Sequence, residues 1–383
     1  MAENQPQKKN RMTSELSRFA ARFRDLCRAC TNNGRASYLS DAQFNQLALE
    51  LFELQFSANA VFQSFCKSRG VTPDVINDWT RIPAVPTTAF KDADLTCLRP
   101  EERSATFHSS GTTRQSRSRH FHSHESLAIY QDSLWPWFET HLLGGAGRNL
   151  DLVMLTPTPA AAPHSSLVYM IEVVRQKIGA APESFVGTVA SDGSWILDFG
   201  RAVATLRNAK VRPVLLLGTA FSFVHLLEYL NERDLILKLP SGSRLMETGG
   251  YKGRSREVPK SELHGMLSKR LGVPPEEIIC EYGMSELSSQ AYDTVAGPIN
   301  DARRAADRHF KFPPWVRTRI VSPETGSIVK FGKPGLLQVF DLANVFSVLA
   351  VQTGDLVVET DGGFELLGRV EQAEPRGCSL MPA

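Results

Sequence analysis

Short apolar runs alternate with amphipathic segments through the middle of this 383-residue chain. The runs typical of buried strands are residues 151–155, 211–217 and 278–281. Apolar residues at helical spacing fill 165–177, 221–232 and 260–271. Strands buried on both faces and separated by helices favour a largely parallel sheet. We therefore predict an α/β fold.

The flanks of this region have a different pattern. Residues 41–70 carry apolar side chains at helical spacing and end at Gly70 and Pro73, so residues 1–80 are predicted to be a helical N-terminal segment. The proline-marked stretch 82–86 is predicted to be an extended entry into the main unit, 81–367. Near the C-terminus, strands are predicted at 337–341 and 356–359, with a hairpin turn at 361–363. Residues 368–383 would form a hinge remnant and tail.

Composition excludes several classes of protein. The chain has 43 Lys and Arg against 41 Asp and Glu, a net charge of +2 that gives no reason to expect a nucleic-acid partner. Apolar runs fall short of the roughly 20 residues that span a bilayer, and the polar start lacks an apolar signal core. We expect a cytoplasmic protein with reduced thiols. Cys27 and Cys30 form a lone C-x-x-C within a helical pattern, which favours a helix face over a zinc or redox site.

Three short motifs carry the chemistry. Ser109-Ser110-Gly111-Thr112-Thr113 is a loop of hydroxyls and glycine suited to holding a polyphosphate. Glu281 to Glu286, E-Y-G-M-S-E, offers an aromatic face for a base, a hydroxyl for a phosphate and a carboxylate for Mg²⁺. Thr353-Gly354-Asp355 supplies an acid that can accept hydrogen bonds from both ribose hydroxyls. Their combination suggests that a carboxylic acid is activated with ATP.

These motifs, together with Gly368-Arg369, resemble those of the adenylate-forming superfamily of acyl and aryl ligases. Residues 247–257 (ETGGYKGRSRE) and 162–170 (APHSSLVYM) resemble one branch, the acyl-protein synthetases. The likeness runs from about residue 80 to the C-terminus. It implies the large-domain fold of that superfamily, behind the helical N-terminal segment, with ATP and Mg²⁺ as cofactors.

The resemblance implies a role for each motif residue. Ser109, Ser110, Gly111, Thr112 and Thr113 would hold the β and γ phosphates, Ser285 would hold a phosphate, and Glu286 would hold Mg²⁺. Tyr282 would stack on adenine, which the backbone at Gly249, Gly250 and Gly283 would approach. Asp355 would bind the ribose, and Arg369 would reach the ribose or a phosphate. Gly283, Met284 and His164 would border the acyl pocket.

The phosphate loop departs from the family pattern at one position. Arg114 stands where the pattern has glycine, and a side chain there disfavours positive φ. The loop is therefore expected to have a different shape, and Arg114 either adds a cation for pyrophosphate or points into solvent. The basic residues from Arg114 to Arg119 fit a polyphosphate better than DNA.

Several histidines and tryptophans have two readings. His164 either borders the acyl pocket or caps the helix that follows it. In residues 120–124, His120, His122 and His124 would share one face of a strand, as a metal site requires. Glu125 would point to the opposite face and no cysteine is near, so a metal site is disfavoured. Trp135 and Trp137 are expected to pack in the core.

The C-terminus holds the last candidate. Superfamily members usually continue past the Gly-Arg hinge into a small domain that bears a catalytic lysine, whereas only residues 370–383 follow here, so that domain is expected to be absent. Residues 376–380 resemble the family's terminal segment with its acyl-accepting cysteine, which makes Cys378 the candidate nucleophile; Arg376 could lower the pKa of its thiol.

Three functions stay open at this point. In the favoured one, a fatty acid is activated and loaded onto Cys378, and the partner that receives the acyl group is left open between an acyl-accepting reductase, a carrier protein and CoA. Alternatively, an acyl or aryl group goes to CoA or a carrier protein, or the chain is a silent nucleotide-binding subunit. An oligomer is compatible with the family.

Overall fold

The computed structural model describes residues 5–31, 38–109, 117–144, 147, 149–249, 258–297 and 308–370. Its helices are α1 (Gln5–Cys30), α2 (Asp41–Ala58), α3 (Ala60–Lys67), α4 (Ala89–Asp92), α5 (His124–Phe138), α6 (Ser166–Ile178), α7 (Phe199–Asn208), α8 (Ala220–Glu232) and α9 (Lys260–Leu271). Single turns of 3₁₀ helix lie at Pro73–Val75, Trp79–Arg81, Pro100–Glu102, Pro182–Ser184 and Pro275–Glu277, and a π-helical turn, Glu139–Leu143, extends α5.

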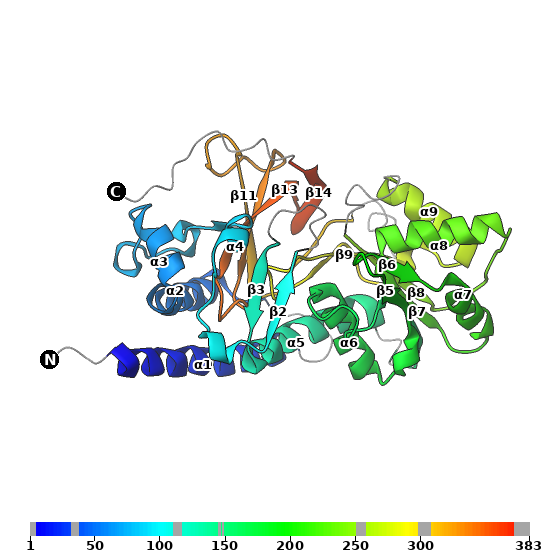
Figure 1. The fold of residues 1–383 in the computed structure, drawn as a ribbon. Helices are drawn as coiled ribbons and strands as arrows, with labels where there is room; N and C mark the ends of the chain where they lie inside the picture. The colour runs from blue at the N-terminus through cyan, green and yellow to red at the C-terminus, as the bar shows by residue number, and fades with distance from the viewer. Residues whose placement is uncertain are drawn as a thin grey trace.

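The predicted parallel sheet forms one half of the molecule (Figure 1). Its strand order is β10 (Ala291–Tyr292), β9 (Ile278–Tyr282), β8 (Arg244–Thr248), β7 (Val214–Thr219), β4 (Asp151–Pro157), β5 (Phe185–Val189) and β6 (Trp195–Leu197). Neighbours from β9 to β5 run parallel, and the two edge strands are antiparallel. The α/β prediction is confirmed. The strand predicted at 211–217 is β7, which begins only at Val214, and Val211 lies outside it and is 87% exposed.

Alternate residues of each central strand enter opposite cores, as a pleated strand requires. On β7, Val214 and Leu216 pack against the helices α7, α8 and α9. Leu215 and Leu217 pack against α5 and α6 on the other face. Trp135 and Trp137 lie in this second core, as predicted.

A second sheet carries the C-terminal motifs. It contains β1 (Val85–Pro86), β13 (Ala350–Thr360), β12 (Pro334–Asp341) and β11 (Val316–Val321) in that order, and β14 (Gly363–Arg369) also pairs with β13. The turn predicted at 361–363 joins β13 to β14, and Gly362 there has a φ of +83°, which favours glycine. Both C-terminal strand predictions are confirmed.

The N-terminal helices share one core with this second sheet. Phe52 of α2 and Phe340 of β12 are both fully buried in it. Gln55 is buried as well: its amide donates to the carbonyls of Asn344 (2.7 Å) and Val345 (3.1 Å) and accepts from the Leu349 N–H (2.9 Å). The helical character predicted for 41–70 is confirmed; the boundary near residue 80 stays a prediction.

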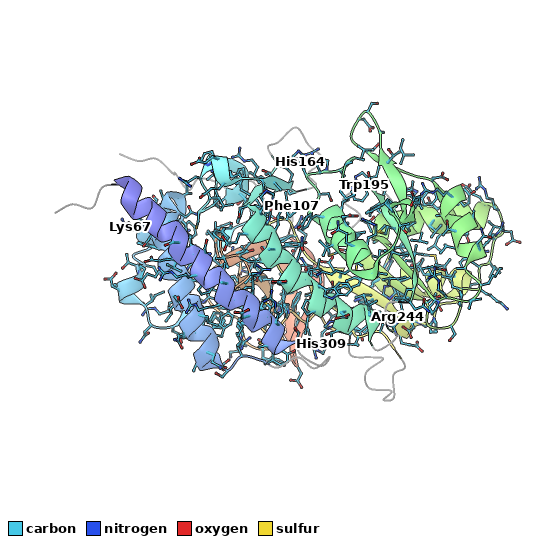
Figure 2. The ribbon with its side chains drawn as sticks, turned by 90° about the horizontal axis from the view of Figure 1, so that it is seen from below. Lys67, Phe107, His164, Trp195, Arg244 and His309 are labelled. Atoms are coloured by element: carbon cyan, nitrogen blue, oxygen red, sulfur yellow. The ribbon has the colours of Figure 1, made fainter. Side chains whose placement is uncertain are left out.

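Helix α1 lies alongside α5 (Figure 2). Arg24 pairs with Asp132 (2.5 Å), and Ser17 donates to Glu125 (2.8 Å). Cys27 and Cys30 are buried on the inner side of α1, where burial raises the pKa of both thiols. The helix-face reading of this pair is therefore confirmed.

Candidate nucleotide site between the two sheets

The site begins at the carboxyl ends of β8 and β9. Thr248 and Glu281 are paired neighbours in the parallel register, so the segments that follow them leave the sheet at the same edge. Such an edge is where open α/β sheets bind ligands. Gly249, the first residue after β8, is exposed and has a φ of +68°, which a side chain would disfavour.

Tyr282 ends β9 and reaches the second sheet. Its ring lies among Phe310, Phe312 and Phe364, with centroid distances of 5.7, 6.1 and 5.4 Å. Its hydroxyl donates to Asp355 Oδ2 at 2.7 Å. Burial raises the pKa of this phenol, and the neighbouring Asp355 carboxylate raises it further, so the hydroxyl stays a donor.

Asp355 is also paired with Arg369. The two residues are cross-strand partners on β13 and β14, and Arg369 Nε donates to Asp355 Oδ1 at 3.1 Å. Asp355 is buried, whereas Arg369 is exposed. Three residues predicted separately for the nucleotide are therefore in direct contact, and they come from both sheets.

Ser285 and Glu286 follow in a buried segment. The Ser285 hydroxyl donates to Glu286 Oε2 at 3.0 Å and lies 3.5 Å from the Ser118 hydroxyl. Ser118 N donates to Ser109 Oγ at 3.1 Å. This series of contacts runs from the base of the hydroxyl loop to the predicted metal-binding carboxylate.

Mg²⁺ commonly binds to one or two carboxylates together with substrate phosphates. The Glu286 carboxylate beside the base of the hydroxyl loop fits that mode. Across the described ranges, no group of three or more His, Cys, Asp or Glu side chains forms a metal cluster. The metal role of Glu286 stays a prediction.

Glu281 belongs to the same edge, and the sequence reasoning assigned it no role. Its carboxylate is buried and accepts a hydrogen bond from the Thr248 hydroxyl. Burial raises its pKa to about 7, despite the Thr248 bond that favours the charged form. A Cβ added to Gly283 would lie 2.4 Å from Glu281 Oε1, so this glycine gives the carboxylate its space.

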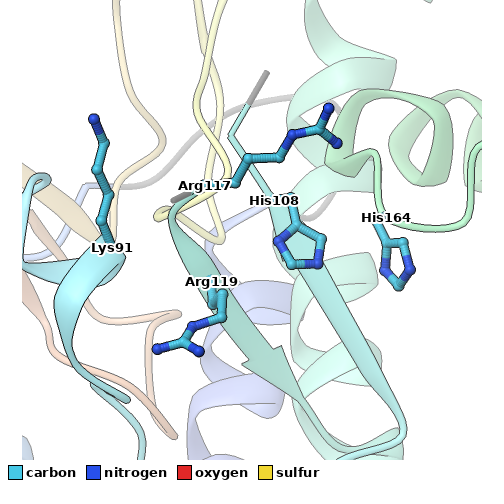
Figure 3. A pocket seen from close by; sticks show the side chains of 5 residues that line it. All are labelled: Lys91, His108, Arg117, Arg119 and His164. Atoms are coloured by element: carbon cyan, nitrogen blue, oxygen red, sulfur yellow. The ribbon is translucent and has the colours of Figure 1, made fainter. Parts of the chain in front are cut away.

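A basic cavity of about 350 Å³ opens beside the hairpin of β2 (Ala105–His108) and β3 (Arg119–His122) (Figure 3). Among the residues that the structure describes, each side chain that lines the cavity carries a basic nitrogen: Lys91, His108, Arg117, Arg119 and His164. Partial burial and the neighbouring His164 lower the pKa of His108. Arg117 and Arg119 belong to the basic stretch expected near polyphosphate. Lys91, on α4, and His108, which directly precedes the hydroxyl loop, were assigned no role from the sequence.

His164 lies on the rim of this cavity. Its Nδ1 donates to the Thr106 carbonyl at 2.9 Å, and its ring centroid is 4.8 Å from that of His108. Ser165 is the residue that caps α6, accepting from Val168 N, so the capping alternative for His164 is wrong. Met284 packs against the core that the N-terminal helices share with the second sheet.

The proposed face of three histidines is also wrong. His120 and His122 lie on β3, but His124 begins α5 after the capping residue Ser123. His120 and His122 are buried, with ring centroids 4.3 Å apart, and burial lowers the pKa of His120 to about 4. The local reason is the capping box, in which Ser123 and Ser126 bond reciprocally and start the helix.

Some predicted residues lie outside the described ranges: Ser110, Gly111, Thr112, Thr113, Arg114, Gly250 and Cys378. Their assigned roles stay predictions. Within the described part of the chain, no helix has both the length and the apolar character needed to cross a membrane.

Comparison with known proteins relates this chain to one family. Residues 37–382 match the family described as acyl-protein synthetase, LuxE. A long-chain-fatty-acid–luciferin-component ligase of Vibrio harveyi is 23% identical over 356 residues, covering 88% of this chain and 86% of its own. The protein of the same name from Aliivibrio fischeri is 24% identical over 360 residues, covering 88% and 87%.

A solved structure shares the fold. The 2-hydroxyisobutyryl-CoA ligase in complex with its acyl-adenylate, 2-HIB-AMP, aligns with a TM-score of 0.63 and 15% identity. The alignment covers 86% of this chain and 68% of that one. The predicted large-domain fold of adenylate-forming ligases is thereby confirmed.

Proposed function

Because the chain belongs to the acyl-protein synthetase family, we propose that it activates a long-chain fatty acid with ATP and transfers the acyl group to its own Cys378. The chain is accordingly an ATP-dependent acid–thiol ligase. The fatty acid as substrate is supported by the names of the two curated relatives. Cys378 as acceptor is supported by the resemblance of residues 376–380 to the family's terminal segment.

One observation carries the adenylation step. Tyr282, Asp355 and Arg369 are joined by bonds of 2.7 and 3.1 Å across two sheets. A carboxylate beside an aromatic ring and an exposed guanidinium can bind a ribose, a base and a phosphate together. We assign these three residues to the nucleotide.

The first step joins the fatty acid to AMP. A carboxylate oxygen of the acid attacks the α-phosphorus of ATP, the bond to the β-phosphate oxygen breaks, and pyrophosphate leaves with that oxygen. Positioning and charge neutralisation are the main tasks of the protein in such a reaction. A bound Mg²⁺ would neutralise phosphate charge, with the Glu286 carboxylate as its protein ligand.

The basic cavity is suited to the departing pyrophosphate. Arg117 and Arg119 follow the hydroxyl loop directly, and Lys91 adds a cation from α4. Guanidinium groups bind phosphate oxygens in pairs of charge-assisted hydrogen bonds. We assign the cavity to the β and γ phosphates.

The second step moves the acyl group to sulfur. The Cys378 thiolate attacks the acyl carbonyl carbon, a thioester bond forms, and AMP leaves with the bridging oxygen. The thiol proton is lost to solvent beforehand, because the thiolate is the nucleophile.

Acid-dependent ATP–pyrophosphate exchange tests the first step. Purified protein with Mg²⁺ is assayed with short, medium and long fatty acids and with benzoates. Exchange with long-chain acids alone is expected. Exchange with benzoates alone would point to an aryl ligase, and ATP binding without exchange would point to a nucleotide-binding subunit.

Intact mass spectrometry tests the second step. A mass increase of one acyl group is expected in the wild-type protein and none in Cys378→Ala, whose exchange rate should match that of the wild type. Cys97→Ala is the control, because Cys97 is a partly buried thiol outside the proposed site. Thioester formation on added CoA by Cys378→Ala would contradict the role of this cysteine.

A further inference from the structure

The segment that carries Glu286 is attached to the strand that leaves the hydroxyl loop. His120, on β3, is 3% exposed, and its Nδ1 lies 2.7 Å from the carbonyl oxygen of Ser285. A carbonyl can only accept, so the ring donates from Nδ1. The peptide bond between Ser285 and Glu286 is therefore tied to β3 at its carbonyl.

The backbone on the C-terminal side of Glu286 is held by hydrogen bonds as well. Asn344 Nδ2 donates to the Glu286 carbonyl at 3.0 Å, and Asp341 Oδ2 accepts from Ser288 N at 3.1 Å. Asp341 is the last residue of β12, and Asn344 lies in the connection from β12 to β13. Glu286 is thus held from both sides, and His120 is the partner that comes from the phosphate-loop hairpin.

We propose that His120 is a positioning residue for the metal-binding carboxylate: its Nδ1–H fixes the Ser285 carbonyl and so sets Glu286 relative to the phosphates. The inference rests on the proposed function only for the Mg²⁺ at Glu286. Loss of a group that hydrogen-bonds a metal ligand directly typically lowers metal affinity or activity about 10- to 100-fold. His120 bonds the backbone beside the ligand rather than its carboxylate, so we expect an effect at the lower end of that range.

Two variants at this position separate the donor from the bulk of the side chain. His120→Leu removes the donor and keeps an apolar side chain, whereas His120→Asn places an amide N–H near the Nδ1 position. His122→Leu is the matched control, because His122 is equally buried on β3 but faces the Ser126 hydroxyl at 3.2 Å.

The readout is ATP binding by calorimetry at a series of free Mg²⁺ concentrations, without any acid. We expect His120→Leu to raise the half-saturating Mg²⁺ concentration about 10-fold. His120→Asn should stay close to the wild-type value, and His122→Leu should lower the melting temperature without moving the Mg²⁺ midpoint. If His120→Leu gives no cooperative melt, His120→Gln replaces it, since its amide reaches the Nε2 position.

Three results would overturn the inference. The first is a half-saturating Mg²⁺ concentration in His120→Leu equal to that of the wild type, and the second is an equal rise of that concentration in His122→Leu. The third is ATP binding by the wild type that does not respond to Mg²⁺. Absence of acid-dependent exchange alongside the expected shifts would defeat the proposed function and leave the positioning role of His120 standing.

Discussion

At the scale of single residues, two arginines share one carboxylate but differ in what they face. Asp94 accepts from Arg103 (2.8 Å) and from Arg119 (3.0 Å). Both guanidinium groups lie over the Phe121 ring, at 4.2 Å for Arg103 and 6.0 Å for Arg119, but of the two only Arg119 is a described lining residue of the basic cavity. Replacing each arginine in turn therefore separates the loss of a cavity cation from the loss of the contact with Asp94.

Arg119→Gln should weaken pyrophosphate binding about 10-fold, because a charge-assisted hydrogen bond to a phosphate is lost. The measurement is the pyrophosphate concentration that half-saturates the exchange reaction. Arg103→Gln removes the same Asp94 contact and should leave that concentration nearly unchanged. Equal effects of the two changes would mean that Asp94, rather than the cavity, is responsible.

Glu281 predicts a pH dependence of stability. Burial raises the pKa of Glu281 to about 7 in the folded protein, whereas the same carboxyl has a pKa near 4.5 in the unfolded chain. Between these two pH values the folded protein therefore keeps the carboxyl protonated and the unfolded chain does not. The unfolded state then binds fewer protons between about pH 4.5 and 7, and stability falls as pH rises through that window. Glu281→Gln should remove this loss.

The expected gain for Glu281→Gln is about 1–3 kcal/mol at pH 7.5 and close to zero at pH 5. Melting temperatures across that range measure it. Glu277→Gln is the comparison: that carboxylate is paired with Arg244 (2.9 Å), so its replacement should lower stability at both pH values. A constant difference between Glu281→Gln and wild type would rule out the shifted carboxyl as the cause.

At the scale of elements, Gly283, the residue that follows β9, has little room for a side chain beside the Glu281 carboxylate. Gly283→Ala would bring its Cβ to 2.4 Å from Glu281 Oε1, and either the carboxylate or the backbone would have to move. We expect a loss of about 1–3 kcal/mol in the free energy of unfolding, together with weaker ATP binding, because Tyr282 is the adjacent residue.

Gly354→Ala is the control for this prediction. Gly354 lies in β13 next to Asp355, and an added Cβ there would meet nothing within 4 Å. Its stability, measured by denaturant unfolding, should match that of the wild type. If both alanines cost the same, the crowding at Gly283 is not the reason.

The elements themselves follow closely from local pattern. Residues 260–271 are predicted and observed as one helix, and the apolar runs become β4, β7 and β9. The prediction that His124 shares a strand face with His120 and His122 is wrong, because the strand does not continue past Ser123. At Ser123 a capping box starts α5. Glu281 and Lys91 were missed for another reason. The tertiary fold alone brings Thr248 to Glu281, and His108 and Arg119 to Lys91.

At the scale of the whole molecule, Gln55 joins the N-terminal helices to the second sheet. Gln55→Leu would leave the Leu349 N–H and two carbonyls without their side-chain partner in a buried environment. We expect a loss of about 2–4 kcal/mol, since unpaired buried backbone groups are costly. Because α2 and β12 share one core, the variant should still unfold in one transition that far-UV circular dichroism and tryptophan fluorescence report alike.

Gln63→Leu provides the comparison, because its amide donates to a single carbonyl within the helices, that of Phe56 (3.2 Å). It should cost less than about 1 kcal/mol. Two separate transitions in Gln55→Leu would instead indicate that the N-terminal helices unfold independently of the second sheet.

The shared core of the N-terminal helices has a consequence for synthesis. Phe44, Phe52 and Phe62 leave the ribosome early, yet the strands that cover them, β11 to β13, are made about 300 residues later. At about 5–20 residues per second, that delay is about 15–60 s. Throughout it the aromatic faces of α2 and α3 lack their final partners, so yield in cells should depend on chaperone supply and on translation speed.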